Sequence, residues 1–400
     1  MLKDLVIKNY KGFKDETTIE FRPLTLVFGE NNAGKSSIVR ILPSIKKTCY
    51  QKKQGVAFYP VEIYKTLPST EFFNNINRPF ELKFNFNDIN FKYEIFVVDN
   101  ELKIISLGIN DNEIINFDSA SNTYKIGLDI IDIELKNLLI DKIENLIEDN
   151  LKSTLSSINE KIISLISKIY WIGPIRHIPQ PIEKLALAQS KMSPDGMEAT
   201  QILAASFFDD QKVFNTVREW FIKIFKQQII LKETGLGRHK MFAIGLSPVE
   251  NTEPMVSIAD CGTGISQILP ILVLLAQAKE GKLGMNPFLI FENPDLHLQD
   301  VIHAELGLIF SQISQCQYKP YIIIETHSEN LLLSMQLAVA KEELSNKDIS
   351  IYWAKKIGDS NILDPITINE NAVLSENWSL DAFRTNVHIS RQIFNVLRAK

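Results

Sequence analysis

A glycine-rich segment near the start of the chain has the residue types that bind phosphate groups. Its residues, with the serine that follows, are Gly29, Glu30, Asn31, Asn32, Ala33, Gly34, Lys35, Ser36 and Ser37. The glycines allow a tight turn in which successive backbone N–H groups converge on one anion. Lys35 would reach the β- and γ-phosphates of a nucleotide, and the Ser36 hydroxyl would be a ligand of Mg²⁺.

The sequence on either side of this loop supplies the elements that such a site needs. The apolar run 24–28 predicts a buried strand, and 36–45 predicts the helix that follows the loop. The positive end of the helix dipole would then point at the bound phosphates. The loop pattern alone also arises by chance, but the flanking strand and helix make a chance match the weaker interpretation.

Two later apolar runs, 287–291 and 321–324, also predict buried strands. The polar residues that follow them are Glu292, Asn293 and Asp295 after the first run, and Glu325 and His327 after the second. The carboxyl ends of parallel strands meet at one edge of an α/β sheet, where ligands bind. We therefore expect Glu292 to hold Mg²⁺ opposite Ser36, directly or through water. His327 would sense the γ-phosphate or position the attacking water.

A second glycine-rich turn precedes the apolar helix predicted over 268–278. Its residues include Gly262, Gly264, Ser266 and Gln267, and no lysine accompanies them. A glycine turn that opens a helix is an anion site of the same physical type as the first loop. From this stretch alone, a simple loop-to-helix turn explains the same residues equally well.

Taken in order, these motifs resemble those of ABC-type ATPases of the SMC/RecF/OLD group. Segment 29–36 matches Walker A, 288–292 matches Walker B, 260–267 resembles the signature loop and 325–328 matches the histidine switch. The chain is most similar to stand-alone bacterial ATPases that share G-P-x-R at 173–176 and end in a short C-terminal domain of unknown function.

The resemblance implies an α/β fold, namely an ABC-type P-loop ATPase core with an antiparallel β lobe and an inserted helical subdomain. It implies ATP and Mg²⁺ as cofactors, and a head-to-tail homodimer or a higher oligomer. Each nucleotide would lie between Walker A of one subunit and the signature loop of the other. There Gly264 and Ser266, with Gly262 and Gln267 in the same loop, would face the γ-phosphate.

One position departs from the family pattern and bears on the rate of hydrolysis. Asn293 stands where relatives carry a glutamate that polarises the attacking water. An amide cannot accept a proton, and loss of a well-placed base typically costs about 10²–10⁴ in rate. Either Asp295 or Glu325 replaces that base, or hydrolysis is slow. No D-x-D motif follows His327, so we expect no nuclease in this chain.

The first half of the chain divides into two predicted segments. Residues 1–125 contain the phosphate loop and a β lobe, because the pattern over 80–116 alternates with a period of two. Residues 126–225 are predicted to be a helical insertion. Apolar residues step by three and four over 131–169, which predicts one long helix or a pair of helices.

The second half contains the remaining two predicted segments. Residues 226–364 complete the ATPase core with the glycine turn and the two acid-terminated strands. Residues 365–400 form the short C-terminal domain, in which a helix is predicted over 381–397.

Net charge, cysteine count and the length of apolar runs limit which partners and which cellular location we expect. The net charge of −5 gives no general attraction to nucleic acid, so DNA or RNA would need a local patch. The lysines at 46, 47, 52 and 53 form one such cluster, for which a solvated helix end is the simpler interpretation. Three cysteines are too few for a disulfide framework. No apolar run is long enough for a membrane span and Met1 leads directly into a strand, so we expect a cytoplasmic protein without a membrane partner.

Three functional hypotheses follow. The first is an ATP-hydrolysing regulatory subunit that dimerises around ATP and controls a separately encoded effector such as a nuclease or toxin, in bacterial antiphage defence, as relatives do. The second is a RecF-like repair ATPase that clamps DNA, which would need a basic channel. The third is a slow or non-hydrolysing ATP-dependent scaffold, motivated by Asn293.

Overall fold

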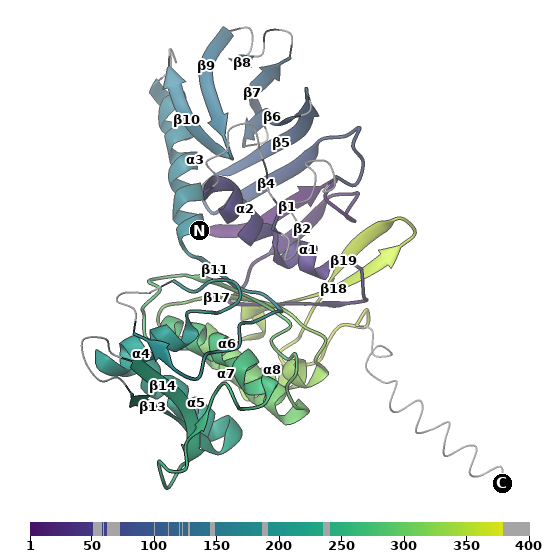
Figure 1. Ribbon diagram of the computed structural model, residues 1–400. Helices are drawn as coiled ribbons and strands as arrows, with labels where there is room; N and C mark the ends of the chain where they lie inside the picture. The colour runs from purple at the N-terminus through teal and green to yellow at the C-terminus, as the bar shows by residue number, and fades with distance from the viewer. Residues whose placement is uncertain are drawn as a thin grey trace, which may run out of the picture.

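The computed structural model describes residues 1–50, 58, 60–61, 73–99, 101–110, 112–119, 121, 123–126, 129–144, 149–185, 191–234 and 241–378. Within them the chain is a mixed α/β protein, as predicted. Figure 1 shows an antiparallel β lobe above a second sheet that is covered by helices. No helix in the described ranges has the length and apolar character needed to cross a membrane.

The second sheet positions the loop and the acid-terminated strands. Its strands, in spatial order, are β11 (Ile169–Ile172), β16 (Phe288–Glu292), β17 (Tyr321–Glu325), β3 (Leu24–Gly29), β18 (Ile349–Ile357) and β19 (Ser360–Ile366). The first five are parallel, and β19 returns antiparallel to β18. Every residue of β3 and β16 is buried, as continuous apolar runs in a parallel sheet require.

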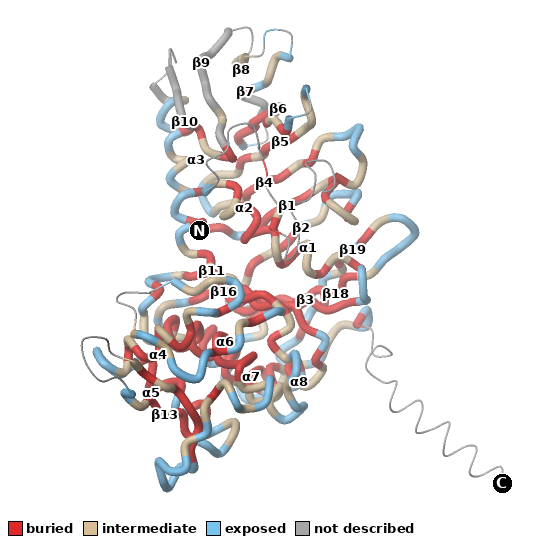
Figure 2. Tube along the Cα trace, in the orientation of Figure 1, coloured by how far each residue is buried: buried red, intermediate tan, exposed pale blue. Residues whose placement is uncertain are grey.

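Alternate residues of these strands point into two separate cores. Leu24, Leu26 and Phe28 of β3 belong to the core that contains the helices below the sheet, whereas Val27 belongs to the core shared with the β lobe. Figure 2 shows the strands as a buried layer through the middle of the molecule. The helices of the lower core are α4 (Ala199–Phe208), α5 (Lys212–Phe225), α6 (Thr263–Lys279), α7 (Asp300–Ser314) and α8 (Glu329–Ala340).

The helix predicted after the phosphate loop is divided in two. Helix α1 covers Lys35–Val39 and α2 covers Ile41–Tyr50, with Arg40 as the residue between them. Apolar residues of both helices, including Ile38, Leu42 and Ile45, are buried in the core between the two sheets. The division leaves Arg40 at the end of α1, from where its side chain reaches the strand ends.

The β lobe is a nine-stranded antiparallel sheet in the order β10-β9-β8-β7-β6-β5-β4-β1-β2. Its strands are β1 (Leu2–Lys8), β2 (Thr17–Glu20), β4 (Phe80–Phe86), β5 (Asn90–Val98), β6 (Glu101–Ile109), β7 (Asn112–Asp118), β8 (Thr123–Ile126), β9 (Asp129–Lys136) and β10 (Leu139–Glu144). The alternating pattern over 80–116 is therefore confirmed as strands.

The helical prediction over 131–169 is wrong in its first part. Strands β9 and β10 occupy 129–144, and the helix α3 covers Asp149–Ser167. Asn137 and Leu138 have positive φ angles of 51° and 69°, which form a tight hairpin turn. Leu138 is fully buried and its carbonyl accepts a 2.9 Å hydrogen bond from the Tyr93 hydroxyl. Tertiary contacts of the turn thus select the hairpin over the helix that the spacing favours.

The remaining elements are small. A four-stranded sheet contains β12 (Glu183–Lys184), β13 (Gln227–Glu233), β14 (Met241–Pro248) and β15 (Val256–Ser257), and a 3₁₀ turn covers Asn346–Asp348. After β19, the chain places Trp378 against Phe28 and Trp353, with ring centroids 5.3 and 5.4 Å apart. The helix predicted over 381–397 lies outside the described residues, and the four segment boundaries remain predictions.

The contact between α7 and α8 gives a direct test of this packing. A Cβ atom on Gly307 would lie 2.0 Å from the Ser334 hydroxyl and 2.7 Å from the Leu331 carbonyl. We expect Gly307→Ala to lower the free energy of unfolding by about 1–3 kcal/mol, the usual cost of overpacking. Denaturant unfolding measures this. Gly262→Ala, whose Cβ would meet nothing within 4 Å, is the control and should change stability little. Equal stabilities would contradict the close helix contact.

Candidate functional site

The phosphate loop connects β3 to α1 and needs glycine at both of its ends. Gly29 has a φ of 143°, and a Cβ there would lie 2.0 Å from the Ala354 carbonyl oxygen. Gly34 has a φ of 87°, and its Cβ would lie 2.7 Å from the Phe13 ring. Both the backbone conformation and the lack of space therefore exclude larger residues at these positions.

Lys35 lies inside the loop. Its ammonium donates hydrogen bonds to the carbonyls of Gly29 at 2.9 Å and Glu30 at 2.7 Å. Burial lowers the pKa of this lysine, and the charges of Glu325 and Glu30 partly oppose that shift. The Lys35 ammonium is thus held by two carbonyls of the loop, close to the buried carboxylate of Glu325.

Glu325, at the end of β17, is the acid that contacts the loop. The Ser36 hydroxyl donates a 2.8 Å hydrogen bond to Glu325 Oε1. The other carboxylate oxygen, Oε2, is buried and has no hydrogen-bond partner among the described residues. Burial, and then the charge of Glu292, raise the pKa of Glu325 to about 7, although Ser36 and Lys35 act in the opposite direction. A buried oxygen without a donor is the environment that a cation would stabilise.

Glu292, at the end of β16, has a different set of partners from those predicted. Arg40 binds it in a bidentate arrangement, with Nε 2.8 Å from Oε1 and Nη2 2.6 Å from Oε2. The Trp171 indole N–H donates a further 2.7 Å hydrogen bond to Oε1. The structure therefore brings Glu325 into contact with Ser36 and places Glu292 one strand away, next to Glu325 in register. The metal role of Glu292 remains a prediction.

Arg176 is a buried connector that the sequence indicated only through the G-P-x-R pattern. Its Nη2 donates to the carbonyls of Glu292 at 2.6 Å and Asn293 at 3.0 Å. Its backbone carbonyl accepts a 3.3 Å hydrogen bond from the Gln267 amide. Burial lowers the pKa of Arg176 to about 10, so the guanidinium stays charged at neutral pH. The second glycine turn and the end of β16 are thereby joined through one side chain.

Asn293 adopts a left-handed conformation with a φ of 44°, which asparagine tolerates better than most residues. Its side-chain oxygen is buried without a hydrogen-bond partner among the described residues. Its backbone N–H donates to the Glu325 carbonyl at 2.8 Å. Asn293 therefore lies between the two acid-terminated strands, and its role in hydrolysis remains a prediction.

Asp295 and His327 lie at the same edge of the sheet. Asp295 Oδ1 accepts a 2.5 Å hydrogen bond from the hydroxyl of the buried Thr326. The His327 side chain is exposed. Desolvation and the Lys35 charge lower the pKa of His327, and Asp295 partly opposes this. The lowered pKa favours the neutral imidazole, and His327 is within electrostatic range of Lys35.

The second glycine turn exposes Gly262 and buries the side chains of Ser266 and Gln267. Gly262 is exposed and precedes the first residue of α6. A Cβ on Gly264 would lie 2.8 Å from the His297 carbonyl oxygen. The buried Ser266 hydroxyl donates to the Thr263 carbonyl at 2.9 Å, and Gln267 is held by Arg176. Gly262 is therefore accessible in this structure, and the role of the turn across a dimer remains a prediction.

A cavity of about 440 Å³ lies over the phosphate loop. The residues that line it are Lys11, Gly12, Asn32, Gly34, Lys35, Ser36, Ser37, Arg40, Glu325, Lys356, Asp359 and Asn361. Several of these were missed by sequence reasoning, because they come from the turn after β1 and from the β18–β19 hairpin. The Asn361 N–H donates to the Gly12 carbonyl at 2.7 Å, which joins the two segments.

No cluster of three or more His, Cys, Asp or Glu side chains with metal-binding geometry occurs in the described part of the chain.

Residues 1–180 match the family described as AAA ATPase domain. This span includes the phosphate loop and Arg176 and ends before both acid-terminated strands. No curated protein matches the chain.

Several solved SMC heads are similar in structure. An SMC head bound to the C-winged helix domain of ScpA is 14% identical, with a TM-score of 0.48, over 92% of this chain and 98% of that chain. The SMC head domain from Thermotoga maritima is 14% identical, with a TM-score of 0.45, over 92% of this chain and 99% of that chain. The Smc head domain with an extended coiled coil from Pyrococcus furiosus is 12% identical, with a TM-score of 0.43, over 99% of both chains. At these values the likeness is partial, and the assignment of the site rests on its own geometry.

The raised pKa of Glu325 makes a prediction about stability. Ionisation of this carboxyl costs more in the folded than in the unfolded protein, so stability is lost as the pH rises from about 4.5 through about 7. We expect Glu325→Gln to be more stable than the parent at pH 8 by about 1–3 kcal/mol, with a smaller difference at pH 5. Denaturant unfolding at both pH values checks this, with the exposed Glu370→Gln as the control. A difference that does not depend on pH would contradict the buried, unpaired carboxylate oxygen.

Proposed function

We propose that this protein binds and hydrolyses ATP with Mg²⁺. The observation that carries the proposal is the 2.8 Å hydrogen bond between Ser36 and Glu325 beside the Lys35 ammonium, all within one cavity of about 440 Å³. A magnesium–triphosphate site needs four kinds of group: a loop of backbone N–H groups, a lysine, a hydroxyl and an acid at a strand end. All four are present here. The match of residues 1–180 to the AAA ATPase domain supports the same function.

The oxygen donors fit a hard divalent cation. Ser36 Oγ and Glu325 are adjacent, and the unpartnered Oε2 of Glu325 offers a further lone pair. Mg²⁺ is usually held by one or two protein oxygens together with substrate phosphates and water, so two donors are sufficient. When bound, the ion would neutralise charge on the phosphates. We assign Ser36 and Glu325 as its direct protein ligands, and Glu292, which lies beside Glu325 on the neighbouring strand, as an acid that does not contact the ion directly.

Hydrolysis is proposed to be slow. The Asn293 amide cannot act as a base, and Glu292 is occupied by Arg40 and Trp171. His327, which is exposed just after β17, and Asp295 are described groups at this edge that could orient water. Long-lived binding of ATP would follow, and a slow or non-hydrolysing ATP-dependent scaffold is therefore the second candidate function.

The exposed glycine turn supports a head-to-tail homodimer as the active form. Gly262 is the N-cap of α6 and Gly264 lies in its first turn, where backbone N–H groups suit an anion, and no side chain of the described residues caps this helix. If a second subunit's nucleotide lies there, contacts to the γ-phosphate exist only in the closed dimer. ATP binding would then act as an association switch.

The biological role is proposed from the resemblance of the motifs alone. Relatives pair such an ATPase with a separately encoded effector, which favours control of a nuclease or toxin in bacterial antiphage defence. A RecF-like DNA clamp is less well supported, because the chain carries a net charge of −5. The candidate nucleic-acid patch was the lysine cluster at 46, 47, 52 and 53. Its positions 52 and 53 lie outside the described residues.

The first test removes the loop lysine. Lys35→Ala should lower the affinity for ATP at least about 100-fold, because one cation on the β- and γ-phosphates is lost from a buried site. Equilibrium binding of a fluorescent ATP analogue in the presence of Mg²⁺ measures the change. Lys341→Ala, at the exposed end of α8, is the control and should bind as the parent does. Unchanged affinity in Lys35→Ala would refute the phosphate-loop assignment.

The second test restores a carboxylate after β16. Asn293→Glu should raise ATP turnover about tenfold or more if the missing base limits the rate. The positive φ of Asn293 disfavours glutamate, so Asn293→Asp is the companion variant that accepts the same backbone more easily. Steady-state phosphate release and the lifetime of the ATP-bound dimer are the readouts. A fall in turnover in both variants, with unchanged melting temperatures, would show that another residue is the base.

A further inference from the structure

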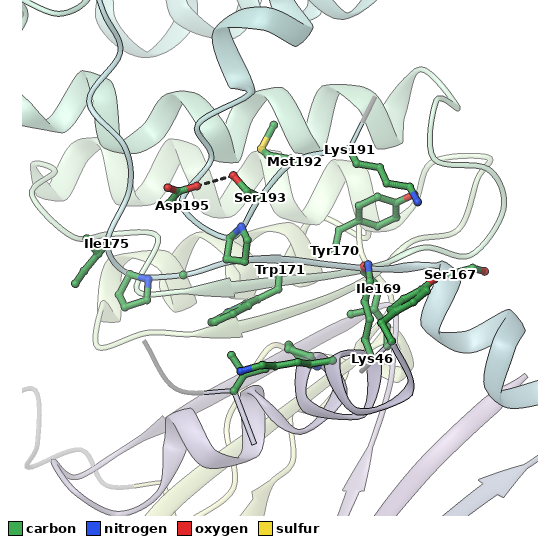
Figure 3. A pocket seen from close by; sticks show the side chains of 17 residues that line it. Lys46, Ser167, Ile169, Tyr170, Trp171, Ile175, Lys191, Met192, Ser193 and Asp195 are labelled. Atoms are coloured by element: carbon green, nitrogen blue, oxygen red, sulfur yellow. Dashed lines mark hydrogen bonds between the residues drawn. The ribbon is translucent and has the colours of Figure 1, made fainter. Parts of the chain in front are cut away.

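A second, larger cavity of about 710 Å³ lies away from the phosphate loop. It is bounded by helix α2, by strand β11 with the residues after it, and by the segment 191–195 (Figure 3). Its volume falls within the range of about 300–1,000 Å³ that small-molecule sites occupy. None of the residues assigned to the ATP site lines it.

The walls of this cavity are apolar and aromatic. Tyr170 and Trp171 of β11 are both half-buried, and they line the cavity from opposite faces of the strand. The other apolar residues that line it are Pro43, Val61, Ile169, Pro174, Ile175, Met192 and Pro194. An aromatic ring in a concave, mostly apolar site favours a ligand with a planar apolar body.

Cations outnumber anions around the same space. Three lysines, Lys46, Lys47 and Lys191, face one aspartate, Asp195, which already accepts a 2.5 Å hydrogen bond from Ser193. Lys46 donates to the Ile169 carbonyl at 2.5 Å and lies 5.5 Å from the Tyr170 ring centroid. Neither Lys46 nor Lys191 forms an ion pair within the described part of the chain. Burial, and then the charge of Lys191, lower the pKa of Lys46, so an anion between the two lysines would relieve their repulsion.

The geometry disfavours an added peptide strand at this edge. Strand β11 is the edge strand of its sheet, and a strand from a partner would need consecutive free backbone groups there. Lys46 occupies the Ile169 carbonyl, and the Gly173 N–H donates to the Pro194 carbonyl at 2.8 Å. Only the backbone of Trp171 remains between these two points, which is too short for strand pairing.

We propose that this cavity binds a small organic anion with a planar aromatic body. The ring system would lie against Tyr170, and the anionic group would lie between Lys46 and Lys191. The cavity is thereby a regulatory site separate from the ATP site.

Trp171 connects the two sites. Its ring lines the cavity, and its N–H holds Glu292 at 2.7 Å. Glu292 in turn binds Arg40, which lines the cavity over the phosphate loop. A ligand that shifts the indole would therefore change the support of Glu292 and the position of Arg40. This coupling rests on the proposed ATPase activity, whereas ligand binding itself does not.

The binding test compares two dyes that differ in one charge. The probes are 8-anilinonaphthalene-1-sulfonate and the uncharged N-phenyl-1-naphthylamine, and fluorescence titration measures the affinity of each. We expect Lys46→Met with Lys191→Met to weaken the sulfonate dye about tenfold or more, the scale of one charge-assisted hydrogen bond. The same double variant should leave the affinity for the uncharged dye within about twofold of the parent value. Equal effects on both dyes, or no effect on either, would overturn the proposal.

Two further variants locate the site and separate its failure from that of the ATP site. Lys35→Ala should bind the sulfonate dye as the parent does, and a weaker affinity would place the dye at the phosphate loop and refute the cavity. Trp171→Phe keeps an aromatic ring but removes the N–H, so it should bind the dye. In the parent, saturating dye should change ATP turnover at least twofold, and in Trp171→Phe it should not. A parent that binds dye with unchanged turnover would overturn the coupling alone, and a parent without turnover would count against the proposed function.

Discussion

Two glutamates lie side by side at the carboxyl ends of β16 and β17, and the structure around them is arranged to accommodate their charges. Glu292 is 1% exposed and Glu325 is 3% exposed, and the two are direct partners in the strand register. Carboxylates buried in this way are costly unless each has partners of opposite charge or hydrogen-bond donors. Arg40 compensates Glu292, and Ser36 and Lys35 only partly compensate Glu325. Glu325, the less compensated of the two acids, is the one that faces the phosphate loop.

This constraint explains why distant segments must meet at one edge of the sheet. Arg40 can reach Glu292 because the helix after the loop is divided at that residue. Trp171 can reach the same carboxylate because β11 lies next to β16 in the sheet. Arg176, five residues further along the chain, binds the backbone at the end of β16 and holds Gln267 in the glycine turn. Loop, acid and turn therefore share one set of buried polar contacts, in which a change at one member alters the support of the others.

The sequence predicted the parts of this arrangement that have local signals. The glycine loop and the apolar strands before Glu292 and Glu325 were identified because their residue types and order are specific. The partners of Glu292 were not, because a single arginine or tryptophan carries no signal for a contact that forms only through the order of strands in the sheet. The hairpin at 129–144 was missed for a related reason. Its apolar spacing also fits a helix, and the turn is selected by Tyr93, which is distant in sequence.

Asn293 shows how the same contacts limit the chemistry. Its positive φ directs the backbone between the two acid-terminated strands, where its N–H binds the Glu325 carbonyl and its own carbonyl binds Arg176. An asparagine fits such a position because its short polar side chain tolerates the left-handed region. Aspartate would tolerate the same backbone and could accept a proton, whereas the Asn293 amide cannot. Slow turnover would then follow from the amide at this position, and a nucleotide switch gains from slow turnover because its bound state persists.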